Sequence, residues 1–114
     1  MPPKANPAKL NPLQLRTLTL LQAIAQIPGA SSPTPEGDTV ITQFPHAHGD
    51  HFHLGDATVM ARDATGLENA NVWNALSRKG LVHAAWPDRI ALTPAGVAYE
   101  TGIADQILHK GADH

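Results

Sequence analysis

The chain has 114 residues, a length that supports one domain with a modest core. Apolar residues make up 42% of the chain but aromatic residues only 4%, so we expect an aliphatic core. The formal charge of −2 at pH 7 is not the basic balance typical of a strong nucleic-acid binder, and the absence of cysteine excludes disulfides and thiolate metal sites. Because no apolar run is long enough to span a bilayer and the N-terminus has no hydrophobic signal core, we expect a cytoplasmic protein with no membrane segment.

The first predicted elements are a flexible arm over residues 1–10 and a helix after it. The arm contains three prolines and few large apolar side chains, a composition typical of loosely attached termini. Asn11 is a favourable helix cap and Pro12 suits the first helical position. The helix is expected to continue to about Ile27, and its broad apolar stripe predicts packing on more than one side.

A loop and a strand follow the first helix. Residues 29–38 are rich in glycine, proline and serine, which predicts a loop. Residues 39–44 are rich in β-branched side chains, which predicts a strand.

A His-rich hairpin is predicted over residues 39–55, and residues 44–55 contain four of the seven histidines. A two-residue turn at His48-Gly49 would pair His46 with His51 and place His46, His51 and His53 on one face. Imidazole nitrogens are common ligands of Zn²⁺ and Ni²⁺. The candidate metal ligands are His46, His48, His51 and His53.

The same histidines have a second interpretation, as surface residues of a solvated turn. A metal site needs converging geometry and supporting hydrogen bonds, and a linear sequence displays neither. Both interpretations of the hairpin therefore stay open.

The run His46-Ala47-His48-Gly49-Asp50-His51 also resembles the HxHxDH metal motif of metallo-β-lactamase-fold hydrolases. Those enzymes are far longer and have further ligands in later strands. The later histidines of this chain do not lie in the corresponding motifs. We therefore expect no enzymatic activity.

Residues 62–82 organise the second half of the chain. Asp56 is expected to cap a helix over residues 57–64, and Gly66 to form the turn after it, because glycine reaches the left-handed conformation without a Cβ penalty. A second helix is predicted from Glu68 or Asn69 to the glycine at position 80. Its inward positions are Val72, Ala75 and Leu76, with Trp73 at their flank, packed against the first helix or the wing.

A small wing and a last helix complete the predicted domain. Residues 81–85 and 89–92 flank Trp86-Pro87-Asp88, which predicts a short hairpin with a proline-containing turn. Thr93 is expected to cap a last helix that has Pro94 at its first position. Residues 111–114 are expected to form a frayed tail.

This order of elements, with Lys79-Gly80-Leu81-Val82 before the hairpin and Leu92-Thr93-Pro94-Ala95-Gly96 after it, resembles winged-helix DNA-binding domains of the MarR or PadR type over about residues 56–100. The resemblance implies an α+β fold, a winged helix-turn-helix with an additional β-hairpin on its N-terminal side, in a single domain over residues 11–110. It also implies a transcriptional regulator that binds duplex DNA as a homodimer.

The outward face of the second predicted helix is polar and lightly basic. Asparagine suits adenine edges, arginine suits guanine, and serine or lysine suits phosphates. The candidate DNA-binding residues are Asn71, Asn74, Ser77, Arg78, Lys79 and Arg89. The alternative is that such residues are ordinary for an exposed helix face. The domain would then be a winged-helix protein–protein interaction module, and the His-rich hairpin could make either version metal-responsive.

Overall fold

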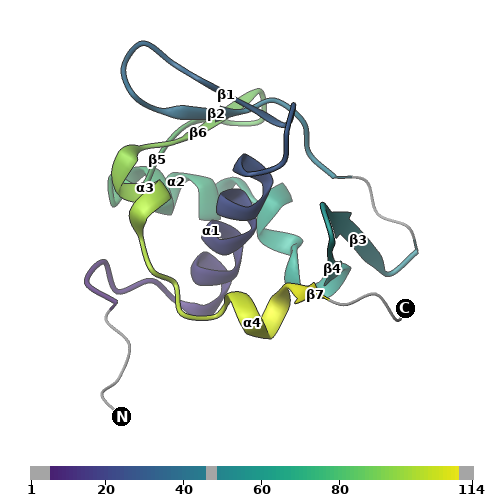
Figure 1. The fold of residues 1–114 in the computed structure, drawn as a ribbon. Coiled ribbons are helices and arrows are strands. Elements are labelled where there is room, and N and C mark those ends of the chain that lie inside the picture. The colour runs from purple at the N-terminus through teal and green to yellow at the C-terminus, as the bar shows by residue number, and fades with distance from the viewer. Residues whose placement is uncertain (1–5, 46–48, 111–114) are drawn as a thin grey trace.

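The computed structural model describes residues 6–45 and 49–110. Within these ranges the chain forms a compact α+β fold of four α-helices, two short 3₁₀-helices and two antiparallel sheets (Figure 1). The helices are α1 (Pro12–Ala25), η1 (Ala61–Asp63), η2 (Thr65–Glu68), α2 (Ala70–Arg78), α3 (Pro94–Ala98) and α4 (Ala104–Ile107). The strands are β1 (Ser31–Pro33), β2 (Thr39–Ile41), β3 (His51–Leu54), β4 (Ala57–Met60), β5 (Val82–Ala85), β6 (Arg89–Leu92) and β7 (His109–Lys110).

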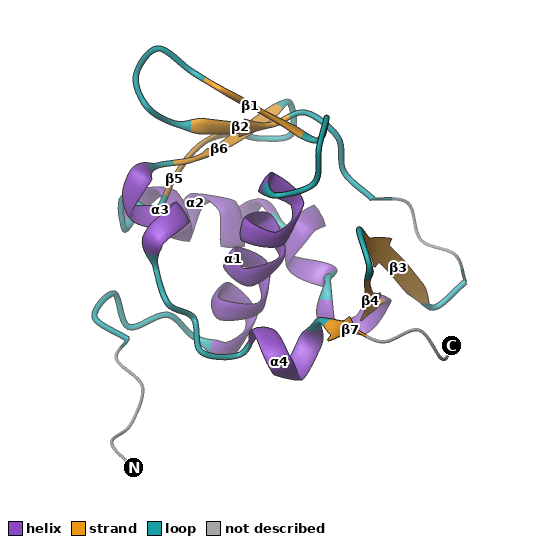
Figure 2. Cartoon of the chain, in the orientation of Figure 1, coloured by secondary structure: helices purple, strands orange, loops and turns teal. Residues whose placement is uncertain are grey.

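Helix α1 is the centre of the fold, and the other elements surround it (Figure 2). It contacts α2, both 3₁₀-helices, β2, α3 and α4. Its start is confirmed as predicted: the Asn11 side chain accepts from the backbone N–H of Gln14, and the Gln14 side chain accepts from the backbone N–H of Asn11. This reciprocal capping box satisfies two N–H groups at the end of the helix.

The larger sheet has the strand order β1-β2-β6-β5. The predicted hairpin after α2 is confirmed as β5–β6, in which Ala85 is opposite Arg89. Strand β2 pairs antiparallel with β6 and so joins this hairpin to the chain segment after α1. Two predictions need correction: the segment predicted as loop contains β1, which pairs with β2, and the strand predicted over residues 39–44 ends at Ile41.

The smaller sheet corrects the predicted His-rich hairpin and the helix predicted over residues 57–64. Residues 57–60 form β4, which pairs with β3 so that His51 is opposite Met60 and His53 is opposite Thr58. The turn is at Gly55-Asp56, where Gly55 has a φ of 61°. A glycine at the first position of a two-residue turn favours a hairpin, and β-branched side chains in 57–60 favour a strand. The helix predicted over 57–64 is reduced to the 3₁₀-turn η1.

The core is aliphatic, as the composition predicted, and Trp73 is its one large aromatic member among the described residues. Gly66 has a different role from the one predicted. It lies inside η2 and does not have a positive φ. It is buried against α1, where a Cβ atom would come 1.8 Å from Thr17 Oγ1. Close helix packing therefore requires glycine here.

The structure has two short helices, α3 and α4, where a single last helix was predicted. Thr93 caps α3 as predicted, with its hydroxyl accepting from the backbone N–H of Gly96 at 3.0 Å. The chain then becomes extended at Tyr99, and Gly102 adopts a φ of 76° before α4 begins. Both features interrupt the helix predicted there.

The arm predicted at 1–10 is described from Asn6 onward, and this part is fastened to the fold. The Tyr99 hydroxyl donates to Asn6 Oδ1 and accepts from the backbone N–H of Ala8. The Asn6 side chain also forms two hydrogen bonds with the backbone of Leu10: its Nδ2 donates to the carbonyl oxygen, and its Oδ1 accepts from the N–H. The tail predicted at 111–114 lies outside the described residues.

In the described part of the chain, no helix is long and apolar enough to cross a membrane.

Candidate nucleic-acid interface

Helix α2 has well-defined caps at both ends, and these caps set where the helix begins and ends. Asn69 caps its start, accepting from the backbone N–H of Asn71 at 2.9 Å. At its end Gly80 has a φ of 76° and donates to the Ser77 carbonyl, while the Leu81 N–H donates to the Leu76 carbonyl. This pair of bonds is a Schellman motif, which satisfies the last carbonyls of a helix. The predicted end of this helix at Gly80 is confirmed.

The two faces of α2 differ sharply. Val72, Ala75 and Leu76 are buried as predicted, and Trp73 is buried with them. Asn71, Asn74 and Arg78 are exposed, and Ser77 is partly buried. Positions three and four apart on a helix are neighbours, so Asn71, Asn74 and Arg78 form one row along α2. This row offers two amides and one guanidinium to a surface outside the molecule.

The β5–β6 hairpin lies against the same helix. Trp86 in the β5–β6 turn meets Trp73 of α2, with ring centroids 4.6 Å apart and planes at 83°. The predicted packing of Trp73 against this hairpin is thereby confirmed. Arg89 opens β6 three residues after Trp86 and is exposed. Within residues 6–45 and 49–110, neither Arg78 nor Arg89 forms an ion pair.

Lys79 is exposed but already engaged within the chain. Its Nζ donates to the Ala8 carbonyl oxygen at 2.7 Å, which links the end of α2 to the N-terminal segment. A phosphate contact from Lys79 would have to replace or share that bond. Lys79 is therefore the weakest of the six predicted DNA contacts on geometric grounds.

The charge around α2 is mixed. Glu68 is exposed immediately before the Asn69 cap, and Asp88 is exposed beside Arg89. These carboxylates offset part of the positive charge of Arg78 and Arg89. The surface is suited to hydrogen-bonding recognition more than to strong electrostatic attraction.

The structure describes half of the predicted metal set. His46 and His48 lie outside the described residues. His51 and His53 lie two apart on β3, with ring centroids 5.0 Å apart and planes at 90°, and Asp50 Oδ1 is 3.4 Å from His51 Nδ1. No group of three or more histidine, aspartate or glutamate side chains suited to a metal occurs among the residues described. Metal binding by this segment stays a prediction.

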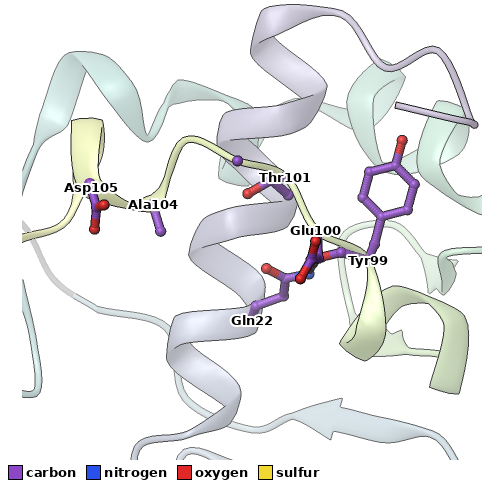
Figure 3. A pocket seen from close by; sticks show the side chains of 7 residues that line it. Gln22, Tyr99, Glu100, Thr101, Ala104 and Asp105 are labelled. Carbon is purple, nitrogen blue, oxygen red and sulfur yellow. Dashed lines mark hydrogen bonds between the residues drawn. The ribbon is translucent and has the colours of Figure 1, made fainter. Parts of the chain in front are cut away.

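A hollow of about 490 Å³ lies between α1 and the 99–105 segment, where side chains of α1 bind the C-terminal segment (Figure 3). Gln22 Nε2 donates to the carbonyl oxygens of Gly96 and Tyr99, at 2.9 and 2.7 Å. The hydroxyls of Thr19 and Thr101 are hydrogen-bonded at 2.6 Å. These polar groups are occupied in holding α1 to the C-terminal segment, and none of the predicted DNA-binding residues lines this hollow.

A second hollow is not predicted by the sequence. It brings together aromatic residues from four separate segments, at positions 44, 52, 73 and 86. The scarcity of aromatics in the chain is a signal that could have drawn attention to them, but no spacing rule links positions so far apart.

No protein-family model matches the chain, and neither a curated protein nor a solved structure matches it.

Proposed function

We propose that this chain is a cytoplasmic DNA-binding protein of the winged-helix type that regulates transcription, with α2 lying in the major groove of duplex DNA. The observation that carries the proposal is the exposed row on α2, supplied by Asn71, Asn74 and Arg78. Asparagine can pair bidentately with adenine and arginine with guanine in the major groove. These side chains lie on a helix that is capped at both ends.

The connectivity supports the same proposal. The chain passes from α1 through β2, the turns η1 and η2, α2 and then the β5–β6 hairpin, and β2 pairs with β6. A winged helix has the succession of helix, strand, helix-turn-helix and two-stranded wing, with the first strand added to the sheet. Here the 3₁₀-turns η1 and η2 stand in the place of the first helix of the helix-turn-helix. The β3–β4 hairpin is an insertion between β2 and η1, on the N-terminal side of α2.

A second copy of the chain would complete the reading surface. Helix α2 has nine residues, so it is roughly 13 Å long at 1.5 Å per residue and reaches few base pairs. We therefore propose a homodimer that reads two half-sites. A pseudopalindromic site with half-sites about one helical turn apart is the corresponding expectation.

Selection of a DNA site followed by a salt titration tests this function. A site is enriched from a random duplex pool, and fluorescence anisotropy then measures its dissociation constant at several salt concentrations. The affinity should fall as salt rises, with a modest slope because Arg78 and Arg89 are the main unpaired cations near α2. Failure to enrich any sequence would contradict DNA reading.

The mixed charge favours a second candidate, a winged-helix module that binds another protein. Glu68 and Asp88 beside the two arginines would repel phosphates but suit a partner surface that carries both signs of charge. Absence of DNA binding at low salt, where electrostatic attraction is strongest, would favour this candidate over the first.

A further inference from the structure

A cavity of about 580 Å³ opens between α2, β3, η2 and the wing turn. We name it the aromatic hollow, and its lining includes Phe44, Phe52, Trp73, Trp86 and Glu68. The chain has two phenylalanines, two tryptophans and one tyrosine. Four of these five aromatic residues therefore line one cavity, in a protein whose core is otherwise aliphatic.

Two of the four rings, those of Trp86 and Phe44, keep part of their surface open to an occupant. Trp86 meets Trp73 edge to face, while Phe44 stacks on Trp73 with centroids 6.1 Å apart and planes at 19°. Trp73 is 2% exposed, but Trp86 is 41% and Phe44 is 37% exposed. Trp86 and Phe44 are two of the three exposed large apolar side chains in the described ranges. An occupant would remove both rings from water.

The charge of the lining selects the kind of occupant. Glu68 is the charged residue of the described lining, and no lysine, arginine or histidine is among its members. An anion would meet the Glu68 carboxylate with no cation to balance it. A cation would meet the carboxylate and the negative faces of aromatic rings, which attract ammonium groups.

We propose that the aromatic hollow binds a small free organic cation with a quaternary ammonium group. The aromatic rings and Glu68 hold the ammonium group. This site does not depend on the proposed DNA function, because it is defined by its own lining and is tested by binding alone.

The test compares choline with its neutral isostere, 3,3-dimethylbutan-1-ol, which has the same shape and hydroxyl but carbon in place of nitrogen. Both tryptophans of the chain line the hollow, so their fluorescence reports occupancy directly. We expect choline to bind about tenfold more tightly than the isostere, from cation–π and carboxylate attraction. Equal affinities for choline and the isostere would overturn the proposal. No fluorescence change with choline up to about 100 mM, which is far above a millimolar dissociation constant, would overturn it as well.

Two exposed positions allow variants that keep the fold. Glu68→Gln removes the charge and Phe44→Leu removes a ring, and each should weaken choline binding several-fold while leaving the isostere nearly unchanged. Asp105→Asn removes an exposed carboxylate on α4, outside this lining, and is the matched control that should bind choline as the wild type does. Loss of choline binding in the control together with Glu68→Gln would show a bulk charge effect and contradict the proposed site.

A further arm tests the source of the ammonium group. Phosphatidylcholine vesicles bear the same ammonium group, and co-sedimentation of the protein with them would contradict a free cation as the ligand.

Discussion

Gly66 lies so close to Thr17 that a Cβ atom on Gly66 would be 1.8 Å from the Thr17 hydroxyl oxygen. That hydroxyl donates to the Leu13 carbonyl at 2.8 Å and is fully buried. The contact sets how closely η2 approaches α1. Because α2 begins two residues after η2 ends, the contact also sets where the proposed reading helix starts.

Gly66→Ala should therefore destabilise the protein by about 2 to 3 kcal/mol, since overpacking a close contact forces the helix backbones apart. Chemical denaturation measures this change. Gly29→Ala is the matched control, because Gly29 has a φ of 83° but a Cβ atom added there would meet nothing within 4 Å beyond its chain neighbours. It should cost only the backbone penalty of about 1 kcal/mol. Adding Thr17→Ala to Gly66→Ala should recover part of the loss, and strict additivity would argue against the contact.

The capping box of α1 gives a second prediction. Asn11→Ala should lower the free energy of unfolding by about 1 kcal/mol, because it leaves the Gln14 N–H at the helix start without its acceptor. Asn11→Asp keeps an acceptor at the same position and should retain most of the stability. An alanine variant as stable as the aspartate variant would show that the cap contributes nothing.

A side-chain pair links the β1–β2 loop to strand β5. His83 Nδ1 donates to Asp38 Oδ2 at 2.6 Å, and the Asp38 side chain is 10% exposed. His83→Ala should destabilise the protein by about 1 kcal/mol, because the carboxylate loses its partner while His83 itself is largely solvated. His109→Ala, at an exposed site in β7, should have no measurable effect. Equal melting temperatures for both variants would contradict a contribution from the pair.

Much of the fold could be predicted where local chemistry determines it. Asn11 and Pro12 mark the start of α1, Gly80 marks the end of α2, and Thr93 caps α3. Each signal acts within a few residues, so a linear sequence displays it. The row of Asn71, Asn74 and Arg78 follows in the same way from the helical period.

The errors occur where contacts between segments decide the outcome. Residues 57–60 are short and mixed enough to form either helix or strand, and their pairing with β3 selects the strand. That pairing also moved the hairpin turn from His48-Gly49 to Gly55-Asp56. The aromatic hollow and the engagement of Lys79 by Ala8 arise from contacts between residues far apart in sequence, which no local pattern records.

The central claim is that α2 reads DNA through its exposed row, and binding by variants of that row tests it most directly. The dissociation constant for the selected site is measured by fluorescence anisotropy at fixed salt. Asn74→Ala and Arg78→Ala should each weaken binding by about tenfold, within the roughly 1–3 kcal/mol of a bidentate base contact. Arg78→Lys keeps the charge but loses the planar fork, so it should keep non-specific binding and lose preference for the site. Gln106→Ala, exposed on α4, is the control for unrelated surface changes. If Asn74→Ala and Arg78→Ala both bind the selected site as tightly as the wild type does, α2 is not the reading helix.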